Sequence, residues 1–349
     1  MTPSRRLSGL LALLAIVLGP WLSASSLGQD DEALAMEIIT AESLTGQQRN
    51  MIDTYVARHA GQILEGQPAQ LASARQMLLA PWDVEAATST FRQHYRQSLA
   101  EHVDAALASD SLLVRLNGAI LAARIRVDLA EPRLDAILAD DSAAVRYWAA
   151  RALREQAASG QLGAARQQSL AQRLRERIDA ESAPAVLEQL LVAMATLPLQ
   201  HAGEPLLQAL NARAARHAEQ PGQSVQPEHA AMQQLYRRLI EADNSPAAVR
   251  VQLSRAALRY MDLLAATLAD ADEEEFDEPV RQQYARCIEL ADHILRTLHR
   301  ELGGAGGAPG AVTSAVEAGD WDAVRTAAQR WRDLLQQPPY NLDEAALAI

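Results

Sequence analysis

Apolar residues recur with the period of an amphipathic helix in four separate segments of the chain. Each segment opens with a short polar stretch and a valine, and the residues four, seven and eight positions after that valine are all apolar or glycine. This spacing keeps one side of a helix apolar, because 3.6 residues complete a turn. The four valines are Val114, Val145, Val186 and Val249. The pattern predicts four helices of one design, which is typical of a repeat protein.

The flanking sequence also has helical periodicity. Before the repeats, helices are expected to begin at the capping box of Thr45, to lie between Pro68 and Pro81, and to run over 88–108. From there the expected helices form pairs: 111–127 with 132–139, 142–157 with 161–178, and 183–196 with 203–217. A surface loop is expected at 217–229, followed by helices at 246–269 and 279–302 and a last helix before Pro338. No segment alternates like a strand, so we expect an all-α protein.

Each predicted helix is short enough to be marginally stable in water on its own. Burying a Val or Leu side chain is worth roughly 1.5 to 3 kcal/mol, but only where a neighbouring helix covers it. The helix pairs must therefore stack to be stable. The valines are separated by 31, 41 and 63 residues, so we expect an irregular α-solenoid of stacked helix pairs.

The phrase Asp-Ser-x-x-Val-Arg, present at 110–115 and 141–146, resembles the start of the second helix of a HEAT repeat in its short prokaryotic form, an armadillo-type element. The resemblance covers about 110–158 and extends more weakly to roughly 260. It implies a row of contacts between acidic residues and arginines of neighbouring units, here called the polar ladder. The resemblance assigns an acid–arginine pair in each of two units and an arginine alone in a third to this ladder. These residues are Asp110 with Arg115, Asp141 with Arg146, and Arg250. Such solenoids serve many functions, so the resemblance bears on the fold alone.

The first thirty residues have the layout of a secretory signal peptide. Two arginines precede an apolar run at 7–22, which small residues and then an acidic segment follow. The run contains Gly19 and Pro20 and is shorter than the roughly 20 residues that span a membrane. We expect cleavage near Gly28, no stable membrane span afterwards, and a location in the periplasm or cell envelope. An uncleaved N-terminal anchor is the alternative.

Together these signals divide the chain into six parts. The expected parts are a signal peptide at 1–28, an N-terminal helical region at 29–109, HEAT-like repeats at 110–269, an acidic loop and helix at 270–302, a Gly-rich linker at 303–310 and a C-terminal helical cap at 311–349.

Charge and cysteine content restrict the classes of partner and the sources of stability that the protein can have. The net charge is −12, and removal of 1–28 takes away two arginines and leaves −14, which disfavours non-specific binding to nucleic acid. The single cysteine, Cys287, excludes an internal disulfide, so stability must come from packing. Cys287 lies on an apolar helical stripe, and we expect it in the core.

The charge is unevenly distributed, since residues 111–177 hold 11 arginines against 7 acids. Seven of these arginines lie off the apolar stripes and are expected to face solvent on or near the solenoid groove. Our hypothesis is that they dock an acidic protein partner, because guanidinium groups suit carboxylates. The alternative is that they pair with the protein's own acids. The residues are Arg124, Arg126, Arg151, Arg154, Arg173, Arg175 and Arg177.

The common sequence motifs of catalytic and cofactor-binding sites are missing from the sequence. It contains no nucleophile elbow, phosphate-binding loop, zinc-protease motif or haem-attachment motif. The pairs His94 with His102 and His293 with His299 are predicted to be surface or interface residues. The acidic run at 270–278 is explained by its place before a helix. We therefore expect no cofactor and no metal.

The favoured interpretation is an exported, non-enzymatic scaffold or adaptor that binds other proteins. One alternative is an accessory subunit or atypical hydrolase of the cell envelope, with a site where the N-terminal helices meet the repeats. The residues of that alternative site are Trp82, Phe91, His94, Tyr95 and Trp148. A further alternative is recruitment of a partner through the Gly-rich segment at 303–310.

Overall fold

The computed structural model confirms an all-α protein. It describes residues 33–127, 131–160, 162–241, 247–271, 276–304, 307–343 and 347, and these residues form fifteen helices and no strand. The expected signal peptide at 1–28 lies outside the described residues, as do 272–275 of the acidic loop and 305–306 of the Gly-rich linker.

The N-terminal region contains a short first helix that was not predicted, followed by three helices close to their expected positions. In chain order they are α1 (Met36–Ile39), α2 (Gly46–Leu64), α3 (Pro68–Leu79) and α4 (Ser89–Leu107). The Thr45 hydroxyl accepts the amide of Gln48 at 3.2 Å, and the Gln48 side chain accepts the amide of Thr45 at 2.9 Å, which completes the capping box. Thr88 caps α4 through the amide of Phe91.

The region predicted to hold the repeats, 110–269, forms helices close to their expected bounds, together with one helix, Gln226–Glu241, that was not predicted. They comprise α5 (Leu112–Ile125), α6 (Glu131–Leu138), α7 (Ala143–Ala158), α8 (Ala164–Ala180), α9 (Pro184–Thr196), α10 (Leu199–Glu219), α11 (Gln226–Glu241) and α12 (Ala247–Asp270). The C-terminal part consists of α13 (Glu278–Glu301), α14 (Thr313–Ala318) and α15 (Trp321–Leu335).

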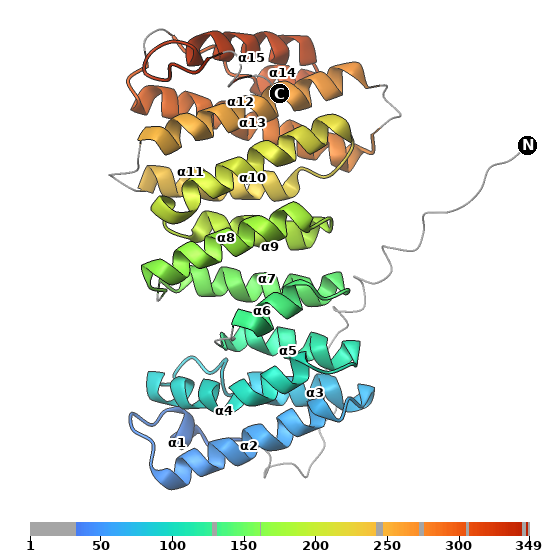
Figure 1. Cartoon of the computed structure of the whole chain (residues 1–349), viewed down its shortest axis with the longest axis vertical. Coiled ribbons are helices and arrows are strands. Elements are labelled where there is room, and N and C mark those ends of the chain that lie inside the picture. The colour runs from blue at the N-terminus through green and yellow to red at the C-terminus, as the bar shows by residue number, and fades with distance from the viewer. Residues whose placement is uncertain are drawn as a thin grey trace, which may run out of the picture.

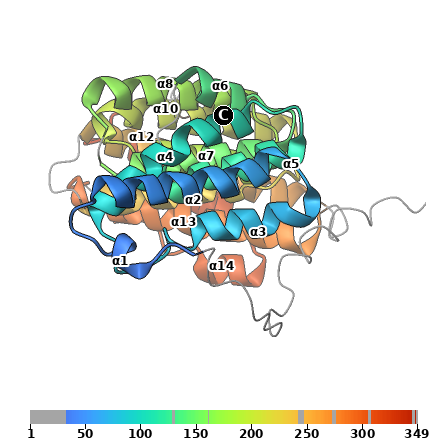
Figure 2. The same ribbon diagram turned by 90° about the horizontal axis from the view of Figure 1, so that it is seen from below.

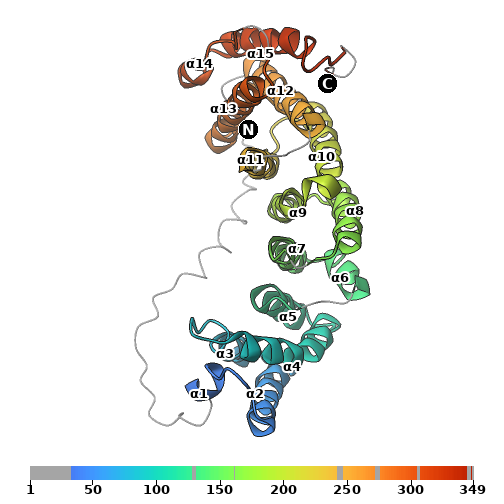
Figure 3. The ribbon, with the colours of Figure 1, turned by 90° about the vertical axis from the view of Figure 1, so that its left-hand side faces the viewer.

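The helices follow one another along the long axis of the molecule in chain order (Figure 1). Seen from the side, they form a curved body in which α5, α7, α9 and α11 make one row on the inner side of the curve, and α6, α8, α10 and α12 make a second row outside it (Figure 3). Helices of the inner row contact each other in turn, and α10 contacts both α8 and α12. The view along the axis has α2 and α3 in front of the later helices (Figure 2).

The core runs through the whole stack. Val114, Val145 and Val186 are buried as the repeat pattern predicts, whereas Val249 is only half-buried. At the C-terminal end α15 packs on α12, and the indole of the buried Trp331 donates to a carboxylate oxygen of Asp292 at 3.1 Å.

One expected loop is shorter than its sequence suggests. The region 217–229 was expected at the surface as a loop, but α10 continues to Glu219 and α11 begins at Gln226. The short connection turns at Gly222, whose φ is +86°. The hydroxyl of Tyr284 holds the turn by accepting the Gly222 amide at 2.9 Å and donating to the Gln223 carbonyl at 3.1 Å.

None of the helices in the described ranges combines the length and the apolar character needed to cross a membrane.

Candidate functional site

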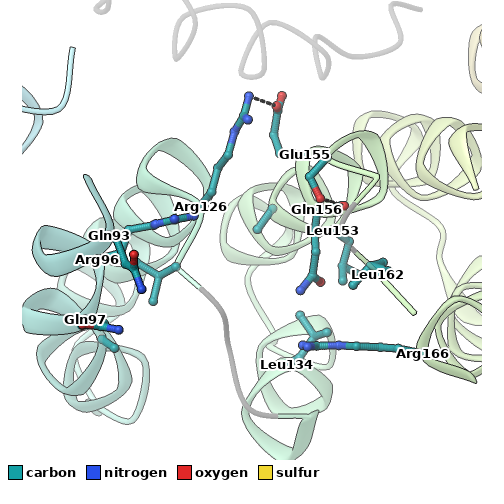
Figure 4. Close-up of a pocket in the computed structure, with 14 residues that line it drawn as sticks. Gln93, Arg96, Gln97, Arg126, Leu134, Leu153, Glu155, Gln156, Leu162 and Arg166 are labelled. Atoms are coloured by element: carbon teal, nitrogen blue, oxygen red, sulfur yellow. Dashed lines mark hydrogen bonds and ion pairs between the residues drawn. The ribbon is translucent and has the colours of Figure 1, made fainter. Parts of the chain in front are cut away.

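A cleft of about 410 Å³ opens where the N-terminal helices meet the first predicted repeats (Figure 4). Helix α4 contributes one wall and α7 the opposite wall, while the end of α5, the middle of α6 and the start of α8 complete it. The volume lies within the range of roughly 300 to 1,000 Å³ that is typical of ligand pockets. The lining residues are Gln93, Arg96, Gln97, Ala100, Arg126, Val127, Leu134, Ala152, Leu153, Glu155, Gln156, Ser159, Leu162 and Arg166.

The cleft has apolar surfaces between polar walls. Val127, which follows the end of α5, is buried, as are Leu134 of α6 and Leu153 of α7. Ala152 stands at an apolar repeat position, yet it is only half-buried because it faces the cleft. The lining therefore offers both apolar contact and hydrogen-bonding side chains.

Three arginines line this cleft. Arg96 lies over the ring of Trp82, with its guanidinium carbon 5.8 Å from the ring centre. Arg126 pairs with Glu155 at 3.3 Å, and Figure 4 shows this ion pair bridging the two sides of the cleft. Arg166 lies on the side of α8. Among the described lining residues Glu155 is the one carboxylate.

The backbone at Arg126 is unusual. Arg126 follows the last residue of α5 and adopts the left-handed conformation, with φ 57° and ψ 46°. Glycine normally takes this position at a helix end because a side chain is disfavoured there. Elsewhere in the described chain, five glycines and Asn341 take positive φ.

The seven arginines of the sequence hypothesis do not form one patch. Four of them lie on α5 and α7 or just after them, and three lie on α8 in the outer row. The partners within the described residues are Asp83 for Arg124 at 2.9 Å, Glu155 for Arg126 at 3.3 Å, the Gln189 amide oxygen for Arg154 at 3.2 Å, Asp135 for Arg173 at 3.7 Å, Asp179 for Arg175 at 3.3 Å and the Asp135 carbonyl for Arg177 at 3.3 Å.

Arg151 is positioned differently from the other six. Its guanidinium lies 5.0 Å from the ring centre of Trp148, which itself meets Tyr147 edge to face. All three side chains are half-buried on α7. Nearby, burial raises the pKa of Glu188, and the charge of Arg154 opposes this rise.

The polar ladder uses the expected arginines with other carboxylates. Arg115 binds Asp140 at 2.6 Å, and Arg146 binds Glu181 through two bonds of 2.8 and 2.9 Å. Asp110 and Asp141 instead offer backbone carbonyls to Arg115 and Arg146, respectively, at 2.9 and 3.1 Å.

The position of the ladder carboxylates explains this difference. Asp140 and Glu181 lie just before the next helix of the inner row, so each also accepts amides at that helix start. The pKa of Glu181 lies below its usual value because the bonds from Arg146 and from the Ser182 and Ala183 amides outweigh its burial. Arg250 binds Glu301, at the end of α13, at 3.1 Å.

The residues of the alternative enzyme site do not meet in one cavity. Phe91 and Tyr95 are fully buried in the core, and the Tyr95 hydroxyl donates to the Leu78 carbonyl. His94 lies 3.0 Å from Asp53, on the surface shared by α2 and α4. Trp82 packs against Arg92 and Arg96, and Trp148 lies on α7.

Cysteine and histidine environments partly match expectation. Cys287 is fully buried as expected, and burial raises the pKa of its thiol well above the ordinary value. His293 is exposed and contacts the Tyr236 hydroxyl at 2.9 Å. His299 was expected near the surface but is buried, because it stacks on Tyr340 and meets Trp331 edge to face. No group of three metal-ligating side chains gathers among the described residues.

Comparison with protein-family models, curated proteins and solved structures finds no match to this chain.

Proposed function

We propose that the chain is a HEAT-like α-solenoid that is exported to the cell envelope and acts there as a non-enzymatic scaffold for other proteins. Two features support a solenoid: the two rows of helices, and the successive contacts of α5, α7, α9 and α11 and of α8, α10 and α12. The repeated ion pairs of Arg115 with Asp140 and of Arg146 with Glu181 support related units, because each links one inner-row helix to the start of the next.

The surface of α7 is the favoured docking surface for a partner. Trp, Tyr and Arg are the residue types that dominate binding energy in protein interfaces. Tyr147, Trp148 and Arg151 bring all three types together on this helix, and each retains exposed surface.

The single observation that carries the proposal is the environment of Arg151. Five of the other predicted arginines contact backbone or side-chain oxygens of the protein's own acidic residues, whereas Arg151 packs on the ring of Trp148. A guanidinium held over an aromatic ring keeps its N–H groups at the ring edge, where they can bind a partner's carboxylate. The partner is therefore expected to be acidic at its contact site.

The test is a crosslinking pull-down from the cell envelope with charge-neutralised variants. R151Q/R154Q should reduce the yield of a specific crosslinked partner several-fold, the loss expected from removing one or two charge-assisted contacts. The matched control is R173Q/R177Q, which removes the same charge from α8 in the outer row and should retain the partner. Equal recovery with both variants and with the unaltered protein would refute docking on α7.

Export is a separate part of the proposal. The mature protein should begin close to residue 28 and should fractionate with the periplasm or envelope. An intact N-terminus in the membrane fraction would favour the anchor instead, and an intact N-terminus in the cytoplasm would refute export.

A further inference from the structure

We propose that the cleft between α4, α6 and α7 binds an acidic segment of a protein partner, in which carboxylate side chains alternate with apolar ones. The inference rests on the proposed scaffold function and specifies where part of the partner binds and what chemistry is recognised. It uses a surface distinct from that of Tyr147, Trp148 and Arg151, none of which lines the cleft.

Charge complementarity identifies the kind of segment. Arg96, Arg126 and Arg166 line a cleft whose described lining holds one carboxylate, so positive charge is in excess there. Arginine binds carboxylates through paired N–H groups, and such charge-assisted hydrogen bonds are stronger than those between neutral groups. An anionic side chain is therefore the group that this lining recognises.

The apolar residues of the cleft lining account for the apolar side chains expected in the partner's segment. Ala100, Ala152 and Leu162 are the half-buried apolar residues of the lining, and the buried Val127, Leu134 and Leu153 lie beside them. The amide side chains of Gln93, Gln97 and Gln156 along the walls can bond to the backbone of an extended peptide, since each has both a donor and an acceptor.

The Arg126–Glu155 ion pair is suited to exchange. The two side chains are 55% and 32% exposed and lie 3.3 Å apart, so the pair contributes little to stability. A partner's carboxylate can take the place of Glu155 at small cost. Glu155 then acts as an internal competitor for Arg126, and its charge lowers the affinity for an acidic segment.

The backbone at Arg126 gives independent support. A left-handed helix end is unfavourable for arginine and favourable for glycine, and such exceptions concentrate at functional sites. Here the exception places a guanidinium at the cleft mouth (Figure 4). Replacing Arg126 with asparagine, which tolerates this conformation, should remove the charge without loss of thermal stability.

The experiment measures binding of a fluorescein-labelled peptide that alternates glutamate and leucine to the purified protein by fluorescence anisotropy. The same peptide with glutamine in place of glutamate should bind at least about tenfold more weakly, because it lacks the charge-assisted bonds. R126N should weaken binding of the glutamate peptide about fivefold to tenfold, and E155Q should tighten it about twofold to fivefold.

The control is R124Q, which removes the same charge two positions away, where Arg124 pairs with Asp83 outside the cleft lining. It should leave binding within about twofold of the original value, the change expected from a screened charge. The proposal is overturned if the glutamate peptide does not bind saturably, if R126N and R124Q weaken it equally, or if E155Q fails to tighten it.

Failure of the cleft proposal can be distinguished from failure of the scaffold proposal. A partner that is lost with R151Q/R154Q but recovered with R126N would uphold the scaffold and refute the cleft as a docking site. Saturable peptide binding in the cleft, with no partner recovered from the envelope, would refute the scaffold function and uphold the cleft as a carboxylate site.

Discussion

At the scale of single residues, Glu228 shows how the interior accommodates charge. This carboxylate has no exposed surface, and one of its oxygens lies 2.7 Å from Arg213 Nε and 3.2 Å from His217 Nε2. Burial acts to raise the pKa of Glu228, but the hydrogen bond and charge of His217, together with Arg213, outweigh it and hold the pKa below its usual value. Glu228 is therefore held in its ionised form, and its contacts with Arg213 and His217, here called the Glu228 cluster, join α10 to α11.

Replacing Glu228 should be strongly destabilising. E228Q leaves the guanidinium of Arg213 buried without its counter-charge, and the expected loss is about 3 to 5 kcal/mol in the free energy of unfolding. Urea denaturation followed by circular dichroism at neutral pH measures it. D322N, which alters an exposed carboxylate 4.0 Å from Arg325, is the control and should leave the unfolding midpoint unchanged. A similar midpoint for both variants would contradict the cluster.

The same cluster predicts how stability depends on acid. An unfolded glutamate titrates near about 4.3, and the folded one titrates lower, so the folded state binds fewer protons in this range. The stability contributed by Glu228 is present above that pH and is lost as the pH falls from about 4.3 towards the folded value. E228Q should therefore lose less stability on acidification than the unaltered protein, and an equal loss would contradict the assignment.

Sequence reasoning identified some site residues and missed others for a physical reason. Arg126 belongs both to the predicted arginine set and to the observed cleft. Arg96 and Arg166 were missed because they lie on α4 and α8, and no local pattern links positions that only packing brings together. Arg115, Arg146 and Arg250 were named from their place after the repeat valines, and each forms an ion pair. Their carboxylate partners differ from the expected Asp110 and Asp141, because the partners depend on how separate segments pack.

At the scale of elements, the sequence predicted α9 but not α11. Helix α9 was predicted nearly to its bounds, and it is apolar almost all round because α7, α8, α10 and α11 enclose it. Helix α11 was not predicted, because it lacks the opening phrase of the repeats. Its buried residues Ala231, Met232, Leu235 and Leu239 nevertheless have helical spacing, which is the signal that could have found it.

The contact between α4 and α5 depends on a glycine. A Cβ atom at Gly118 would lie 2.9 Å from the Cβ of Ala106 and 3.3 Å from the backbone nitrogen of Leu107. G118A should therefore destabilise the protein by about 1 to 3 kcal/mol through overpacking, although alanine favours helices. The matched control is G61A in α2, where a Cβ would meet nothing within 4 Å. It should stabilise the protein by about 0.5 to 1 kcal/mol.

Urea denaturation of the two alanine variants gives opposite signs if the close approach of α4 and α5 is correct. Stabilisation by both would mean that α5 does not pack tightly on α4, and would contradict the observed contact.

At the scale of the whole molecule, sequence reasoning predicted the helical class and the order of most helices, but it did not predict the curvature of the body. Curvature depends on small rotations between successive units, which no single segment encodes. The inner position of α7, on which the proposed docking surface depends, follows from that curvature (Figure 3). The C-terminal closure by α15 was expected from its apolar stripe, and the buried Trp331 and its bond to Asp292 account for how it is held.

The central claim is that each helix is stabilised by its immediate neighbours in one stack. Hydrogen exchange followed by mass spectrometry on L191A tests this most directly, because Leu191 is fully buried in α9 and its truncation should cost about 2 to 5 kcal/mol. The account predicts faster exchange in α7, α9 and α11, with α2 and α15 unchanged, and no change anywhere for the exposed control I240A. An equal increase from α2 to α15 in L191A would contradict it.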